Sequence, residues 1–512
     1  MSKGKLIFAG ALASLVVVAI AQQKYRDPRS FEYKEALKDT KAVTATERST
    51  GGYGDQPRGT DDPLFVAQEL LGRPTDRSVT VNVASRKDVD AYFEYGTKSG
   101  AYTGRSSTYR FAAGVPTNAF IGDLKPNTRY FYRMRYKLAG AADFATRPEH
   151  SFMTQRPPGS AFTFVVQFDP HLLAANDMDA YKLSLKKMLA DKPDFMIDLG
   201  DTAFIDRENP ATMGIPAFQA HLTQRNQYVR SYFDLINHSV PLYLVLGNHE
   251  GEWAARRDGT PNNMAVMHTV TRKQYFPNPE PNDFYSGPTR LEQYVGLRQA
   301  SYAWQWGDAL FIALDPYWNA PQAPEQAGDW WTTLGKDQYD WLKNTLETSK
   351  AKYKFIFSHN LIGGVNMKGQ MRGGIETLKY LEMGGYNLDG TWGFDKARPG
   401  WAMPIHPLLV ANNTTIYFHG HDHLYVKQDQ DGIVYQEGPV PARSGLYDAT
   451  AAAKDYNYTH GKVVGGSGYL RVRVAPDDVK VDYVQTYLPK EEDATHKDGM
   501  LGDSYTIKAR KR

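Results

Sequence analysis

The fold is indicated by a short apolar stretch that ends in a glycine and a carboxylate, Asp194-Phe195-Met196-Ile197-Asp198-Leu199-Gly200-Asp201. An apolar run of this length is typical of a strand buried in a sheet. Gly200 has no Cβ, so the backbone can turn sharply where the strand ends. The stretch therefore predicts a buried strand that presents Asp201 at its carboxyl end.

Polar side chains follow four other predicted strands in the same way. Ligand sites in α/β sheets lie at the carboxyl ends of strands, so the five strands can present these groups to one crevice. Six of the 13 histidines belong to these motifs, which random placement would not produce. The other four motifs are Asp169-Pro170-His171 after Phe168, Gly247-Asn248-His249-Glu250 after Leu246, Ser358-His359 after Phe357, and His419-Gly420-His421-Asp422-His423 after Phe418.

Predicted helices separate these strands along the chain. Apolar residues recur with helical spacing at 179–190, and further helices are expected at 221–235 and 338–348. Runs of alternating apolar and polar residues at 469–474 and 479–487 indicate a pair of antiparallel strands near the end of the domain. This order predicts an α/β domain whose sheets are buried between helices.

The region before this domain has a different pattern. Residues 22–75 are polar and broken by glycine and proline, which predicts a linker or a strap. From residue 76 to 155, short alternating runs separated by turn residues predict a small β-sandwich. Within it, Leu124-Lys125-Pro126-Asn127-Thr128-Arg129-Tyr130 resembles the L-x-P-x-T-x-Y signature of fibronectin type III-like domains.

Composition excludes several classes of protein. The 512 residues include 60 Lys plus Arg and 57 Asp plus Glu, a near balance that argues against nucleic acid as a partner. Cysteine is absent, which excludes disulfides, thiolate metal ligands and a cysteine nucleophile.

The first 21 residues have the pattern of a signal peptide. Lys3 and Lys5 precede the uncharged run Leu6 to Ala21, which ends in the small-x-small sequence Ala19-Ile20-Ala21. The run is shorter than the ~18–20 apolar residues that span a bilayer, so cleavage is favoured over an uncleaved membrane anchor. The mature chain is then expected to be secreted or periplasmic, with no stable membrane span.

The side chains in the five motifs indicate the kind of metal. Imidazole, carboxylate and amide oxygen suit Zn, Fe or Mn ions. There are too many potential ligands for one ion, and a bridging carboxylate can hold two ions ~3.5–4 Å apart, the arrangement used for in-line displacement at phosphorus. The motifs therefore predict two divalent or mixed-valence ions.

In this order, the motifs D-x-H, G-D, G-N-H-E, a lone H and G-H-x-H resemble the calcineurin-like metallophosphoesterase signature, over residues 160–490. The resemblance implies a four-layer αββα sandwich, with His249 acting on the leaving group. With the preceding β-sandwich, the layout resembles the secreted purple acid and alkaline phosphatase D-like phosphatases. The resemblance implies one ion on Asp169, His171, Asp201 and His423, and a second on Asp201, Asn248, His359 and His421, with Asp201 bridging.

The sequence departs from the purple acid phosphatases at one informative position. Those enzymes carry a tyrosine three residues after the bridging aspartate, where this chain has Phe204.

Arg372 lies in a glycine-rich loop and is a candidate for binding a phosphate oxygen, because guanidinium suits phosphate geometry. Residues 491–512 are expected to form a C-terminal tail.

The expected activity is hydrolysis of a small phosphorylated substrate, most simply a phosphomonoester, with a metal-bound hydroxide as nucleophile. A phosphodiesterase or nucleotidase on the same metal centre is the alternative enzyme, because the motifs do not separate monoesters from diesters. The alternative of another class is a binding protein with a vestigial metal site.

Overall fold

The computed structural model describes residues 62–172, 176–203, 208–321, 330–362, 371–443 and 447–510. The predicted signal peptide, residues 22–61 of the predicted linker, and Phe204 lie outside these ranges. Within them, no helix is both long and apolar enough to cross a bilayer.

The first sheet has nine strands in the described part of the chain and joins segments that are far apart in sequence. Its centre is parallel, with Phe164 opposite Phe195 and Met196 opposite Leu242. It includes β1, from the predicted linker, and ends at one edge in β22, from the predicted tail. In spatial order the strands are β22 (Leu501–Lys508), β21 (Asp478–Gln485), β20 (Gly468–Val474), β10 (Phe162–Gln167), β11 (Phe195–Asp198), β12 (Leu242–Leu244), β1 (Leu70–Gly72), β2 (Val79–Val83) and β6 (Thr117–Ile121).

The second sheet has seven described strands, of which β14, β15, β16 and β18 are parallel neighbours. Parallel strands end at the same edge of a sheet, so the segments after β15 and β16 emerge side by side. In spatial order the strands are β13 (Tyr302–Trp306), β14 (Ala309–Ala313), β15 (Tyr353–Phe357), β16 (Ile416–His419), β18 (Ile433–Glu437), β17 (Tyr425–Gln430) and β19 (Lys462–Val464).

The two sheets pack face to face through a largely aromatic core. Alternate side chains of β10 enter this core because successive residues of a strand point to opposite faces. The ring centroid of Phe164 lies 5.4 Å from that of Phe195 in its own sheet and 5.2 Å from that of Phe311 in the other sheet. Such aromatic pairs bury large apolar areas and fix the sheets against each other.

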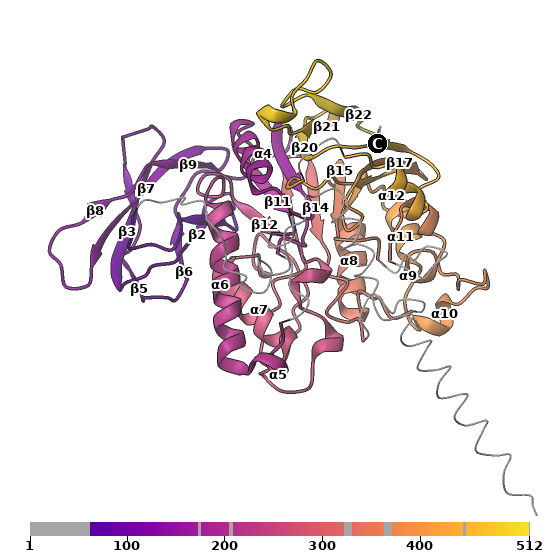
Figure 1. Ribbon diagram of the computed structural model, residues 1–512, viewed down its shortest axis with the longest axis horizontal. Coiled ribbons are helices and arrows are strands. Elements are labelled where there is room, and N and C mark those ends of the chain that lie inside the picture. The colour runs from indigo at the N-terminus through magenta and orange to yellow at the C-terminus, as the bar shows by residue number, and fades with distance from the viewer. Residues whose placement is uncertain are drawn as a thin grey trace, which may run out of the picture. The chain divides into compact units, whose positions relative to one another are not determined.

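Helices cover the outer faces of both sheets (Figure 1). On the first sheet, Tyr181 of α4 (Met178–Ala190) bonds to Gln167 of β10 and packs on Tyr232 of α6 (Ile215–Phe233). On the second sheet, α8 (Lys336–Thr348) and α11 (Ile405–Ala411) pack against the outward side chains of β14 and β15. The predicted four-layer αββα fold is thereby confirmed. The remaining helices of the described residues are α5 (Pro210–Met213), α7 (Met264–Tyr275), α9 (Leu381–Gly384), α10 (Phe394–Ala397) and α12 (Thr450–Asp455), with short 3-10 turns at Asn248–Glu250, Ala254–Arg256, Ile375–Thr377 and Pro489–Glu491.

The segment 251–300 contains a helix that the sequence did not predict. The segment contains glycine, proline and asparagine with little periodicity, which indicates a long loop, but Met264–Tyr275 form helix α7. Asn263 caps this helix by accepting a hydrogen bond from the backbone N–H of Val266. The apolar face is short and mixed with polar side chains that are themselves buried, including His268 and Arg272, so the helical period is hidden.

The predicted N-terminal all-β region is confirmed, and it shares strands with the main body (Figure 1, indigo). Strands β2 and β6 belong to the first sheet and pack in one core with the third sheet. In that core the Tyr130 hydroxyl accepts a hydrogen bond from the backbone N–H of Lys125. The third sheet contains β3 (Val89–Gly96), β4 (Gly104–Arg105), β5 (Tyr109–Phe111), β7 (Arg129–Leu138), β8 (Ala145–Thr146) and β9 (His150–Met153).

A pair of stacked histidines links the β-rich region to the main body. The ring of His150 on β9 lies 4.1 Å from the ring of His238, and the Tyr132 hydroxyl donates to the His238 carbonyl. Burial lowers the pKa of His150, which also feels the charges of Glu69 and Arg147. Burial, assisted by His150, lowers the pKa of His238 to about 3. The folded protein therefore holds His238 neutral at pH values where an unfolded chain would protonate it.

We expect this pair to make the fold sensitive to acid. Below about pH 6.5 the unfolded chain binds a proton at His238 that the folded chain does not, so stability falls as the pH drops, at up to about 1.4 kcal/mol per pH unit. His238→Gln should therefore lose less stability than the wild type between about pH 6.5 and 4 in denaturant titrations. His460→Gln, at a histidine with a 73% exposed side chain, is the control and should follow the wild type. Parallel curves for His238→Gln and wild type would contradict this prediction.

Candidate metal centre

The predicted metal ligands converge from both sheets. Asp169 and His171 follow β10, Asp201 follows β11, and Asn248 follows β12. From the second sheet, His359 follows β15, while His421 and His423 follow β16. The histidine and carboxylate side chains form three overlapping groups in which the ligand atoms lie within 4.8 Å of one another: Asp169, His171 and His423; His171, Asp201 and His249; and Asp201, His359 and His421.

One end of the cluster is built around two imidazoles. The Nε2 atoms of His171 and His423 are 2.9 Å apart. Asp169 Oδ1 lies 3.8 Å from the first of these atoms and 3.5 Å from the second. Two imidazole nitrogens that converge beside a carboxylate oxygen match the donor set of a Zn, Fe or Mn ion.

The other end is built around His359. Its Nε2 atom lies 3.1 Å from Asp201 Oδ2 and 3.1 Å from the side-chain oxygen of Asn248. Its Nδ1 atom is 2.9 Å from the carbonyl oxygen of Leu199, which orients the ring. With a metal bound, a proton kept on Nδ1 would leave the Nε2 lone pair facing the cluster, which is the tautomer that a metal ligand needs.

Asp201 connects the two ends. Its Oδ2 atom is 3.1 Å from His359 Nε2, 3.6 Å from His171 Nε2 and 3.8 Å from His249 Nε2. That oxygen is buried and has no hydrogen-bond partner among the residues that the structure describes. A buried carboxylate oxygen without a donor is costly, and a cation satisfies it. The residues present therefore fit metal ions at this site.

The backbone of the ligand residues is strained. Five of them adopt positive φ angles, a region that non-glycine residues rarely occupy. Such strain persists only where the surrounding structure imposes it, and it gathers at functional sites. The values are 48° at Asp169, 46° at His171, 49° at Asp201, 77° at His421 and 65° at His423.

The glycines of the motifs make room for these carboxylates. A Cβ on Gly247 would lie 2.2 Å from Asp201 Oδ1, and one on Gly420 would lie 2.4 Å from Asp169 Oδ2. The backbone N–H groups of His249 and His421 donate to these same two carboxylates. The strand-end loops thus hold the carboxylates as well as carry ligands.

The electrostatics of the cluster favour a negative charge on Asp201 and a positive charge on His359. Burial alone would raise the pKa of Asp201, but the charges of His359, His249 and His171 bring it well below its usual value. Burial would lower the pKa of His359, but Asp201 and Asp169 raise it to about 9. Burial lowers the pKa of His421 well below its usual value, so this ring is a neutral donor.

Glu250 fixes the two loops of the first sheet to each other. Its carboxylate accepts hydrogen bonds from the backbone N–H groups of Asp201, Thr202 and Gly247. Arg225 on α6 donates to the carbonyl of His249 and lies 3.9 Å from Glu250. A carboxylate that accepts several N–H groups organises a loop without touching the metal.

Two aromatic residues that the sequence did not assign to the site support Asn248. Trp253 donates its indole N–H to the carbonyl of Asn248 and stacks on Tyr317, with 5.2 Å between ring centroids. The Tyr317 hydroxyl donates to the side chain of Asn360, the residue after His359. In the sequence, the only signal for Tyr317 is its position shortly after the apolar run Ala309–Ala313, which forms β14.

Arg372 lies beside the last motif, in contact with backbone and a carboxylate. Its Nη1 donates to the carbonyl of His421 at 2.7 Å and to Asp422 Oδ1 at 3.2 Å, and its side chain is only 10% exposed. Asp422 also accepts from the Gly373 N–H and the Tyr458 hydroxyl. The binding of a phosphate oxygen by Arg372 stays a prediction.

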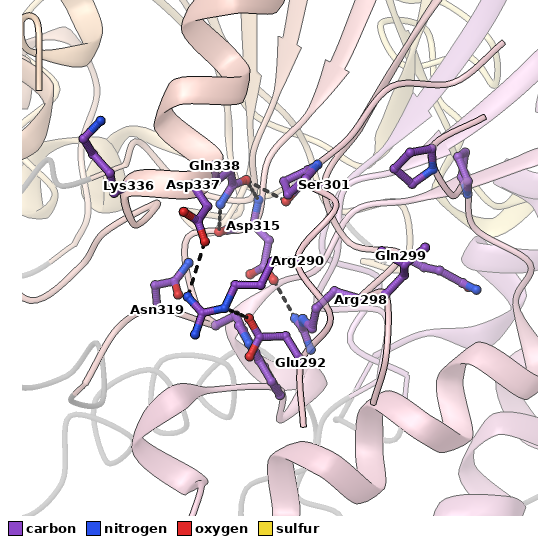
Figure 2. A pocket seen from close by; sticks show the side chains of 15 residues that line it. Arg290, Glu292, Arg298, Gln299, Ser301, Asp315, Asn319, Lys336, Asp337 and Gln338 are labelled. Atoms are coloured by element: carbon purple, nitrogen blue, oxygen red, sulfur yellow. Dashed lines mark hydrogen bonds and ion pairs between the residues drawn. The ribbon is translucent and has the colours of Figure 1, made fainter. Parts of the chain in front are cut away.

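A surface pocket of about 130 Å³ lies outside this cluster and is lined by none of the predicted site residues. Figure 2 shows two sets of paired charges in this pocket: Arg290 lies between Glu292 and Asp337, and Arg298 contacts Asp315. These internal pairs leave its guanidinium groups engaged.

Comparison with known families agrees with this geometry. The sequence model described as calcineurin-like phosphoesterase matches residues 163–425, which include all five motifs. The chain belongs to the calcineurin-like phosphoesterase family. It is accordingly a metal-dependent phosphoesterase.

Solved structures share the fold across most of the chain. The structure of PhoD has a TM-score of 0.61 at 14% identity, covering 88% of this chain and 91% of that one. A purple acid phosphatase from yellow lupin seeds has a TM-score of 0.56 at 17% identity, covering 86% of this chain and 74% of that one. A search of curated proteins gives no match.

Proposed function

We propose that this chain is an exported phosphomonoesterase with a binuclear metal centre that acts on small phosphorylated substrates. The observation that carries the proposal is the position of Asp201, whose one unbonded carboxylate oxygen, within the described part of the chain, faces imidazoles at both ends of the cluster. Export is supported by the charged and apolar pattern of residues 1–21.

The ligand assignment follows the two ends of the cluster. Asp201 would bridge, because it belongs both to the group that contains His359 and to a group that contains His171. Such ions, of Fe, Zn or Mn, would activate a water molecule and neutralise charge on the phosphoryl oxygens. We assign one ion to Asp169, His171, Asp201 and His423, and the other to Asp201, Asn248, His359 and His421.

The remaining residues of the site protonate the leaving group or hold the loops that carry the ligands in place. His249 is placed to donate a proton to the leaving-group oxygen, because its backbone N–H anchors on Asp201 Oδ1 at 2.8 Å and its ring borders the cluster. Glu250 and Arg225 keep the loop that carries His249 in place. Arg372 holds the carbonyl of His421 and so positions the loop of the last motif.

Elemental analysis and a substrate panel test this function. The purified protein should hold close to two equivalents of Fe, Zn or Mn, because the seven ligands form two donor groups around one bridge. The metal-loaded enzyme should hydrolyse p-nitrophenyl phosphate faster than bis(p-nitrophenyl) phosphate, and a chelator should abolish both activities. A single equivalent with full activity would contradict the binuclear centre, and a preference for the diester would indicate a phosphodiesterase.

A further inference from the structure

Arg443 lies next to the His171 and His423 end of the metal cluster. It follows β18, whose residue Glu437 is paired in register with His419 of β16. After the strand, the backbone N–H of Gly438 donates to the carbonyl of His419. The segment that leads to Arg443 therefore runs beside the loop that carries His421 and His423.

A second contact brings the same segment to the His171 loop. The carbonyl of Ala442, the residue before Arg443, accepts a hydrogen bond from the backbone N–H of Asp177 at 2.8 Å. The neighbouring Asn176 donates its side-chain amide to the carbonyls of Pro170 and His171. Hydrogen bonds of the segment before Arg443 therefore connect it to the loop that carries His171 and to the loop that carries His421 and His423.

The guanidinium of Arg443 has no acidic partner among the described residues. Its Nη1 is buried and has no hydrogen-bond partner in the ranges that the structure covers. The group stacks on the ring of Tyr447 at 3.9 Å, which holds it in place without using its N–H donors.

Arg372 differs from Arg443 in this respect. It stacks on Tyr456 at 4.7 Å in a similar way, but its Nη1 is engaged by Asp422 and by the carbonyl of His421. Arg443 is therefore the arginine at this edge that keeps a donor for a ligand, within the part of the chain that the structure describes. A buried polar group without a partner calls for an unseen water or ion, and guanidinium suits phosphate oxygens.

We propose that Arg443 binds the third non-bridging oxygen of a phosphomonoester and so selects monoesters over diesters. The inference rests on the proposed function, because it places the phosphoryl group on the two metal positions. A phosphomonoester dianion has three non-bridging oxygens, and two cations can neutralise two of them. A diester has only two such oxygens, so it offers Arg443 no anionic partner.

The test compares Arg443→Met and Arg443→Lys with the wild type on p-nitrophenyl phosphate and bis(p-nitrophenyl) phosphate. Arg443→Met should lower kcat/KM for the monoester about 10²-fold, as for loss of one donor to a developing oxyanion, and change the diester value less than about threefold. Arg443→Lys should recover part of the loss, because it keeps the charge but not the two-donor geometry. Arg473→Met, at a 54% exposed arginine on β20, is the matched control and should change neither value.

Orthophosphate binding and metal content separate this inference from the proposed function. Calorimetry should show orthophosphate binding about tenfold or more weaker to Arg443→Met than to wild type, at equal metal content, since a hydrogen bond to a charged group is lost. Equal losses on both esters, or unchanged orthophosphate affinity, would overturn the role of Arg443. A wild type that hydrolyses neither ester would refute the proposed function instead, and the calorimetric comparison would still decide on Arg443.

Discussion

His421→Ala is expected to remove one metal ion and abolish hydrolysis of every phosphoester alike. His421 shares its group with Asp201 and His359, and burial holds its ring in the neutral form that donates to a metal. The ion is worth several kcal/mol of charge stabilisation, so kcat should fall about 10³-fold or more. Elemental analysis should show the loss of about one equivalent of metal.

The control for this variant is His460→Ala, which removes an exposed histidine and should retain metal and activity. The loss in His421→Ala should be the same for esters with good and poor leaving groups, because the defect precedes bond cleavage. A His421→Ala protein with two ions and near-normal kcat would show that His421 is not a ligand.

His249→Ala should keep both ions and lose rate, by the roughly 10²–10⁴-fold typical of general acid catalysis. The loss should be small for nitrophenyl phosphate, whose leaving group departs without a proton, and large for an alkyl phosphate. The measurement is kcat/KM on the two esters together with metal content.

The metal measurement is needed because the His249 ring lies close enough to other candidate ligands to bind a metal itself. Its ring forms a group with His171 and Asp201, so a metal-binding role is geometrically possible. His249→Gln serves as the second variant, since it keeps an amide near the cluster and tests whether any loss reflects an emptied loop position. A metal-depleted His249→Ala, or equal defects on aryl and alkyl esters, would make His249 a ligand or a structural residue.

Much of the metal cluster could be predicted from sequence because each ligand follows a strand. Strand length and apolar character are local properties, and the carboxyl ends of parallel strands meet at one edge. This reasoning predicts that Asp169, Asp201 and His359 lie together, and their side chains do converge.

The supporting residues could not be predicted in the same way. Trp253 and Tyr317 lie in segments without a recognisable period, and their stacking joins residues that are distant in sequence. Arg443 resembles any loop arginine in the sequence, and only the contacts of Ala442 and Gly438 place it at the cluster. Helix α7 was missed because buried polar residues interrupt its apolar face.

The sequence by itself determined the α/β class, the strand-end motifs and the kind of metal, since these depend on local period and on side-chain chemistry. Tertiary structure alone decided that β1, β2 and β6 extend the first sheet. It also gave the distances at which Asp201 stands between the two imidazole groups, a position that the family resemblance had implied. It also decided that Arg443 keeps an unpaired donor beside them, among the residues described. The physical reason is that strand pairing and side-chain convergence are set by contacts between residues distant in sequence, and no local pattern records which partners meet.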